Sequence, residues 1–103
     1  MGKVTNKQVI KELKKLKKKY KLDKLLLFGS RARGEELLTS DVDVIVISKT
    51  FSKIPFRDRP DKFLMAWPMP VDLEILCYTP EEIERKRKEY GLVREALKQG
   101  MEI

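Results

Sequence analysis

Histidine is absent from the 103-residue sequence, and cysteine occurs once, as Cys77. Without histidine the chain cannot use Ser-His-Asp catalysis or bind a metal through imidazole, and one cysteine cannot form an internal disulfide or a zinc cluster. Long apolar runs are also missing, since none reaches the ~18 residues of a membrane span, and no signal-peptide pattern begins the chain. We therefore expect a cytoplasmic protein with no membrane contact, whose chemistry depends on carboxylates.

Acidic residues are fewer than basic residues. Lysine and arginine total 23 against 16 aspartates and glutamates, which gives a formal net charge of +7. Such an excess favours polyanionic partners, either nucleotides or nucleic acid. A chain of this length is expected to form one domain, residues 1–103, around one modest core.

Much of the positive charge lies in residues 3–24, which hold ten lysines. Apolar residues recur there every three or four positions, and Thr5 and Gln8 have the spacing of a capping box, so an amphipathic helix is predicted. The apolar positions are Val9, Ile10, Leu13, Leu16 and Tyr20. Its lysine face is interpreted either as a surface that attracts phosphate or as the solvated face of a lysine-rich helix.

Apolar runs and alternating patterns predict three strands, at residues 24–28, 41–48 and 71–78, with residues 101–103 as a short edge strand. Helical spacing and capping signals predict further helices at about residues 30–37, 61–67, 80–90 and 92–99. Residues 49–60 are predicted to be irregular. A group of charged residues in and just after this segment is interpreted as a surface charge cluster rather than a substrate clamp: Arg57, Arg59, Asp61 and Lys62. The fold class is α/β (α+β), with a small sheet of three to four strands packed with helices.

The first predicted strand is followed by Gly29 and Ser30. A glycine lets the backbone turn sharply and approach a ligand closely, while free N–H groups and the Ser30 hydroxyl can hold phosphate oxygens. Ten residues separate Ser30 from the next polar motif, Asp41-Val42-Asp43, which is enough for a short helix and a return beside the first strand. A phosphate-binding turn and two carboxylates are therefore predicted to be neighbours.

Asp41 and Asp43 share one face of their strand because strand side chains alternate. Two carboxylates ~4 Å apart repel by about 4 kcal/mol at an effective dielectric of 20, so the pair needs a cation or a proton. Oxygen ligands without histidine favour Mg²⁺. Asp72 and Glu74 form a second acidic pair, and one of them could complete a three-carboxylate site for two metal ions.

Gly29-Ser30, followed by Ser40-Asp41-Val42-Asp43 before an apolar strand, resembles the Gly-Ser and Asp-x-Asp signature of the polymerase-β-like nucleotidyltransferase superfamily, and in particular its small minimal nucleotidyltransferase (MNT) members. The segment 76–82 is similar to the part of that family that follows its third acidic strand. The resemblance implies the fold of that family, with a mixed sheet. It covers residues 25–103, while the lysine-rich helix matches by position only.

The resemblance also implies functional roles. Asp41 and Asp43 would bind two Mg²⁺ ions, and a third acid on the later strand would share one of them. Gly29 and Ser30 would hold the β- and γ-phosphates of a nucleoside triphosphate. An acceptor hydroxyl would attack the α-phosphorus and expel pyrophosphate.

Two assignments stay open. The third acid is Glu74, which lies at the expected distance before residues 77–80, or Asp72, which has the residue type usual in the family; we favour Glu74. Arg31 and Arg33 are predicted either to contact triphosphate oxygens or to pair with Glu35 and Glu36.

The predicted function is Mg²⁺-dependent transfer of a nucleoside monophosphate, AMP from ATP, to a hydroxyl acceptor. The family precedent suggests that this acceptor belongs to a HEPN-type partner in a toxin–antitoxin pair. One alternative is a non-catalytic module that binds a nucleotide and docks a partner protein. A third is a basic protein that binds nucleic acid through the lysine helix.

Overall fold

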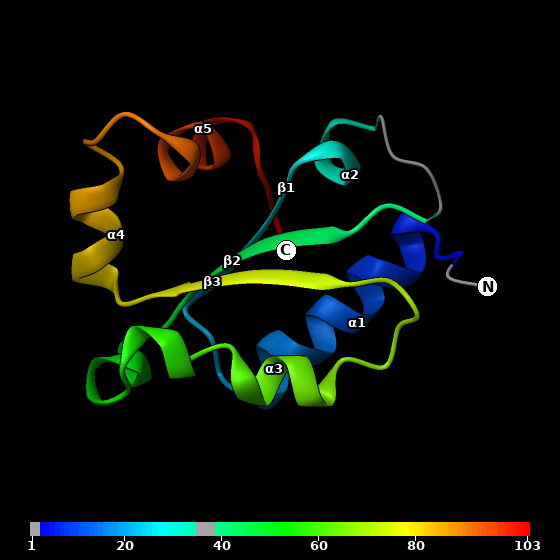
Figure 1. Cartoon of the computed structure of the whole chain (residues 1–103), viewed down its shortest axis with the longest axis horizontal. Coiled ribbons are helices and arrows are strands. Elements are labelled where there is room, and N and C mark those ends of the chain that lie inside the picture. Colours follow the sequence, from blue (N-terminus) through cyan, green and yellow to red (C-terminus); the bar gives the residue numbers. More distant parts are fainter. Residues whose placement is uncertain (1–2, 35–38) are drawn as a thin grey trace.

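A mixed four-stranded sheet forms the centre of the protein, as the computed structural model shows for residues 3–34 and 39–103 (Figure 1). The strands are β1 (Lys24–Phe28), β2 (Val42–Ile47), β3 (Leu73–Tyr78) and β4 (Met101–Glu102), in the order β3-β2-β1-β4. β1 is antiparallel to both β2 and β4, whereas β2 and β3 are parallel. The predicted α+β class, with a small mixed sheet of three to four strands, is confirmed.

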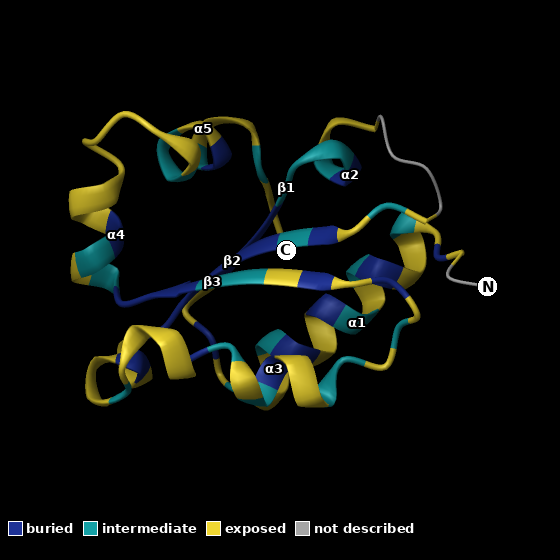
Figure 2. Ribbon diagram, viewed as in Figure 1, coloured by how far each residue is buried: buried dark blue, intermediate teal, exposed yellow. Residues whose placement is uncertain are grey.

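Both faces of the sheet are covered. Val42, Val44 and Val46 belong to the cluster on one face, which includes apolar residues of α1 (Asn6–Lys19) and α3 (Asp61–Ala66). Ile45 and Ile47 belong to the other cluster, with residues of α4 (Pro80–Lys86) and α5 (Leu92–Gln99). β2 is therefore apolar on both sides in its second half, as its alternation predicted (Figure 2).

α1 begins where the sequence indicated. Thr5 and Gln8 form the capping box, and Val9, Leu13 and Leu16 are buried against the sheet. Most of its lysines are exposed, while Lys17 reaches the C-terminal residue and donates a hydrogen bond from Nζ to the Ile103 carbonyl at 2.9 Å. Within the described residues, no helix has the length and apolar character required to cross a membrane.

Several predicted element bounds differ from the structure, and β3, for example, begins at Leu73 rather than at residue 71. α2 spans Ser30–Arg33, and Gly34 ends it in the left-handed conformation with φ 74°; residues 35–37 of the predicted helix lie outside the described residues. α4 ends at Lys86 rather than at residue 90, and residues 87–90, which follow it, are exposed. The irregular segment contains two short 3₁₀ helices, Lys49–Lys53 and Phe56–Asp58.

Arg59 is buried, so the prediction that it belongs to a surface charge cluster is wrong. Its guanidinium donates to the Glu82 carboxylate at 2.6 Å and to the carbonyls of Ile54 and Cys77 at 2.9 and 3.1 Å. These bonds connect the 3₁₀ segment to β3 and α4. A buried arginine is stable only with such partners, because each unpaired donor would incur a desolvation cost.

Candidate functional site

The turn after β1 is pressed against β2. Gly29 has φ 76°, a conformation that L side chains rarely adopt, and a Cβ placed on it would collide with Oδ2 of Asp43. This proximity follows from strand register, because Phe28, the last residue of β1, is paired with Asp43 on β2. Only glycine both adopts this positive φ readily and lacks a Cβ that would collide with Asp43. The turn and the carboxylate are therefore direct neighbours, as the sequence predicted.

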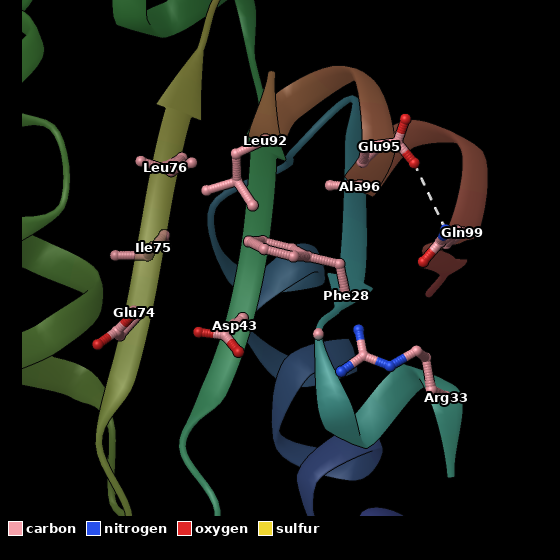
Figure 3. A pocket seen from close by; sticks show the side chains of 11 residues that line it. Phe28, Arg33, Asp43, Glu74, Ile75, Leu76, Leu92, Glu95, Ala96 and Gln99 are labelled. Atoms are coloured by element: carbon pink, nitrogen blue, oxygen red, sulfur yellow. Dashed lines mark hydrogen bonds between the residues drawn. The ribbon is translucent and has the colours of Figure 1, made fainter. Parts of the chain in front are cut away.

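Asp43 and Glu74 are brought together by the parallel pairing of β2 and β3, which places them opposite each other. The two carboxylates lie on neighbouring strands beside the same cavity (Figure 3). The pKa of Asp43 is raised to about 6, first by partial burial, then by the charge of Glu74 and a hydrogen bond with it, and by the charge of Asp41; Arg33 opposes the shift. The site therefore concentrates negative charge.

The other two predicted acids are arranged differently. Asp41 is exposed and precedes β2, and its charge reaches Asp43. Asp72 is exposed, and its carbonyl accepts a hydrogen bond from the Val42 amide at 2.8 Å, but Asp72 is not among the residues that line the cavity. In the described part of the chain, no three carboxylate or thiol groups form a cluster that could hold a metal ion.

A cavity of about 460 Å³ extends from this acidic pair towards α5. One end is polar, with Gly29, Arg33, Asp43 and Glu74. The other end is lined by Phe28, Ile75, Leu76, Leu92 and Ala96 together with Glu95 and Gln99. This size and mixture of surfaces are typical of a small-molecule site.

The α5 wall was not predicted from the sequence. Gln99 donates a hydrogen bond to Glu95 at 3.5 Å on this wall (Figure 3). Local spacing predicted the helix, but its position over the end of β1 depends on the turn at Gly100 and on the pairing of β4 with β1. Phe28 had one available signal, because it directly precedes the Gly29-Ser30 motif.

The two arginines of α2 have different environments. Arg33 lines the cavity, and its charge acts on Asp43. Arg31 is 1% exposed and donates to the carbonyls of Val4 and Ser40. Its burial disagrees with the prediction that Arg31 contacts triphosphate oxygens, because the guanidinium is already bound within the protein. The predicted pairing with Glu35 and Glu36 lies outside the described residues.

The chain is similar to known proteins over most of its length. A family model described as "Nucleotidyltransferase domain" matches residues 7–102. The protein named "Putative protein adenylyltransferase MJ0141", from Methanocaldococcus jannaschii, is 35% identical over 71 residues, which are 66% of this chain and 72% of that protein.

A second protein of that organism, "Putative protein adenylyltransferase MJ1215", is 50% identical over 36 residues, 35% of this chain. The chain spans only 42% of the length of MJ1215 in this match, and 37% of the length of MJ0126, another relative of the same organism, in a separate match. A solved structure described as a "putative nucleotidyltransferase" from Sulfolobus solfataricus has 28% identity and a TM-score of 0.49, covering 62% of this chain and 56% of that one.

Proposed function

We propose that this chain, which belongs to the nucleotidyltransferase domain family whose model matches residues 7–102, transfers AMP from ATP to a hydroxyl acceptor. The observation that carries this proposal is the contact of Gly29 with Asp43, with Glu74 beside it. The turn at Gly29, which leaves room for a phosphate group, therefore lies next to two carboxylates, Asp43 and Glu74, that would attract a cation.

The donor set fits Mg²⁺. Its ligands would be oxygens only, which this hard cation prefers. The pKa of Asp43 is raised first by burial and then by the charge of Glu74, and a cation would offset the second of these causes. Asp43 and Glu74 would hold the ion together with substrate phosphates. The family resemblance assigns Asp41 as a further ligand, although the three acids do not form a cluster in the described residues. The position of Asp72 outside the cavity makes Glu74 the better candidate for the third acid. When bound, Mg²⁺ would neutralise charge on the phosphates and on the leaving pyrophosphate.

The protein groups around the cavity have complementary roles in this proposal. Gly29 lines the cavity and, with Ser30 beside it in the chain, would hold the β- and γ-phosphates, while the guanidinium of Arg33 would provide positive charge there. The apolar end, with Phe28 and Leu92, receives the nucleoside. The acceptor oxygen attacks the α-phosphorus, and the bond between the α-phosphorus and the pyrophosphate oxygen breaks. A carboxylate of the acidic pair takes the proton of the acceptor hydroxyl.

A protein hydroxyl is the proposed acceptor. This follows the names of the relatives, which describe protein adenylyltransferases. The resemblance to minimal nucleotidyltransferases suggests a HEPN-type partner in a toxin–antitoxin pair as the protein that carries it.

The test is label transfer from ATP carrying a radioactive α-phosphate into proteins of a lysate, with Mg²⁺ present. Asp43→Ala should abolish the transfer, and excess EDTA should do the same. Glu74→Ala should reduce it far more than Asp72→Ala if Glu74 is the third acid. Labelling that persists in Asp43→Ala would refute the proposal, and binding of ATP without any transfer would favour the non-catalytic alternative.

A further inference from the structure

We propose that Arg31 is a positioning residue for the nucleotide site, because its buried guanidinium joins the phosphate-binding turn to the segment that carries Asp41. This inference rests on the proposed function for its consequence, but its geometric basis is independent. Arg31 directly follows Ser30 in the chain, and Ser40 directly precedes Asp41. The side chain therefore connects the two halves of the site one residue away from each.

The bonds join Arg31 to two other segments of the chain. Nε of Arg31 donates to the Ser40 carbonyl at 3.0 Å, which fixes the segment before β2. Nη1 donates to the Val4 carbonyl at 2.9 Å and to Oδ1 of Asn6 at 3.0 Å, both at the start of α1. Asn6 returns a hydrogen bond from Nδ2 to the Arg31 carbonyl at 3.0 Å. Both the main chain and the side chain of Arg31 are thus held.

α2 needs such an anchor because it cannot hold its own position. It has four residues, and Gly29 provides no side-chain cap. Its main-chain hydrogen bonds are long, from Arg33 N to Gly29 O at 3.3 Å and from Gly34 N to Arg31 O at 3.4 Å. A single helical turn of this kind is unstable in isolation, so its place beside Asp43 must come from tertiary contacts.

Arginine is required for this geometry. Its planar guanidinium presents donors in fixed, divergent directions, so one side chain reaches Ser40, Val4 and Asn6 together. Lysine keeps the charge but has one nitrogen at the end of a flexible stem, and it cannot replace the Nε bond while also reaching Val4 and Asn6. Arg31→Lys therefore tests geometry at constant charge.

Arg59 offers a matched control. It is also a buried arginine, 6% exposed, and it also donates to two main-chain carbonyls, those of Ile54 and Cys77. Neither Arg59 nor its bonded partners line the cavity that contains Asp43. Arg59→Lys thus disturbs a comparable buried network away from the site, and it separates loss of positioning from general loss of stability.

The experiment measures ATP affinity in the presence of Mn²⁺ by titration calorimetry, well below the melting temperatures of all variants. Arg31→Lys should weaken ATP binding by about tenfold or more, because displacement of a site by ~1 Å is enough for effects of this size. Asn6→Ala should act in the same direction with a smaller effect. Arg59→Lys should lower the melting temperature and leave ATP affinity within about twofold, as expected for a remote site.

Amide hydrogen exchange provides a second readout that does not need the nucleotide. Residues 29–34 and 40–43 should exchange faster in Arg31→Lys but not in Arg59→Lys. If Arg31→Lys does not fold, Asn6→Ala takes its place in both measurements. Unchanged ATP affinity in the Arg31 and Asn6 variants, or an equal loss in Arg59→Lys, would overturn the inference.

The two proposals fail in different ways. If the wild-type chain binds no ATP with Mn²⁺, the proposed function is refuted. The positioning of the turn by Arg31 is then decided by hydrogen exchange alone, in which equal protection of residues 29–34 in wild type and Arg31→Lys would refute it.

Discussion

Gly29 shows how one residue without a side chain can define a site. Its positive φ and the absence of a Cβ allow the turn after β1 to lie directly on the carboxylate of Asp43. Gly34, which ends α2, shares the positive φ, but a Cβ placed on it would meet no atom of the described residues within 4 Å. The two glycines therefore separate backbone strain from steric conflict with the site.

Gly29→Ala should destabilise the fold by about 1–3 kcal/mol through backbone strain and should also abolish ATP binding, because the new methyl group displaces Asp43. Gly34→Ala should have the strain cost alone, about 1 kcal/mol, and retain ATP binding. Urea unfolding and calorimetric titration with ATP and Mn²⁺ measure the two effects. Equal ATP affinity in both variants would show that the contact with Asp43 has no functional role.

The ionised carboxylate of Asp43 is predicted to lower the stability of the folded protein. Its pKa in the folded state is about 6 against 3.8 as the ordinary value, so the folded state binds the proton more tightly. Stability should therefore fall as pH rises from about 4 to about 6, when the carboxylate ionises.

Asp43→Asn should consequently be more stable than wild type at pH 7.5 in EDTA, by about 1–3 kcal/mol, and the difference should vanish near pH 4. Thermal or urea unfolding at the two pH values tests this. Asp72→Asn is the control and should change stability little, since Asp72 is exposed and outside the cavity. A destabilised Asp43→Asn at pH 7.5 would contradict the electrostatic argument.

At the scale of elements, α4 is held at its first turn by one shared carboxylate. Glu82 accepts a hydrogen bond from the Thr79 amide at 2.8 Å in the capping box and also pairs with buried Arg59. The hydrogen bond from Arg59 is the main reason that the pKa of Glu82 is lowered to about 2. The cap of the helix and the anchor of the 3₁₀ segment are thus one network.

Glu82→Gln should lower the free energy of unfolding by about 3 kcal/mol at pH 7, because it leaves the buried guanidinium of Arg59 without its anion. In wild type this stabilisation is complete above pH 4.5 and is lost as pH falls towards 2, so the variant should show a flatter acid profile. Glu84→Gln, which breaks the exposed pair with Arg87, should change stability by less than about 0.5 kcal/mol. Urea unfolding at pH 7 and pH 3 compares all three proteins, and equal losses would contradict the network.

These elements also show what local sequence can predict. The alternation in β2 gave both faces of the strand, and the Thr79-Pro80 start of α4 was visible because capping involves neighbours in the chain. The burial of Arg59 was not predictable, since its partner Glu82 is 23 positions away and a charged residue between prolines is usually exposed.

The candidate site divides in the same way. The turn at Gly29 and the acids Asp41 and Asp43 were evident from their spacing. The pairing of Asp43 with Glu74 depended on the order of the strands, and the direction of Arg31 depended on where α1 begins. Contacts that cross the sheet are decided by tertiary packing, which periodicity does not encode.

At the scale of the whole molecule, charge is unevenly distributed. The lysines of α1 are mostly exposed, and the helix packs on the valine face of β2, whereas the cavity lies on the face that carries Asp43. The basic surface and the candidate site are therefore on opposite sides of the sheet, and their functions can be separated by mutation.

The alternative in which the lysine helix binds nucleic acid has its own test: replacement of Lys11, Lys14 and Lys18 by glutamate should then remove most of any affinity for single-stranded RNA and flatten its dependence on salt. Each phosphate contact contributes about −0.7 to the slope of log affinity against log salt for single strands. ATP affinity should be unchanged. Fluorescence anisotropy at several salt concentrations measures the first effect, and RNA affinity that survives the triple substitution would exclude this helix as a polyanion surface.

β3, which carries Glu74, is one of the two edge strands of the sheet that the described residues form (Figure 1). In the proposed function, the reaction centre then sits at the margin of the protein rather than at the bottom of a tunnel. A bulky folded acceptor could present one side chain there without unfolding or threading. The target could therefore approach from the open side of the sheet.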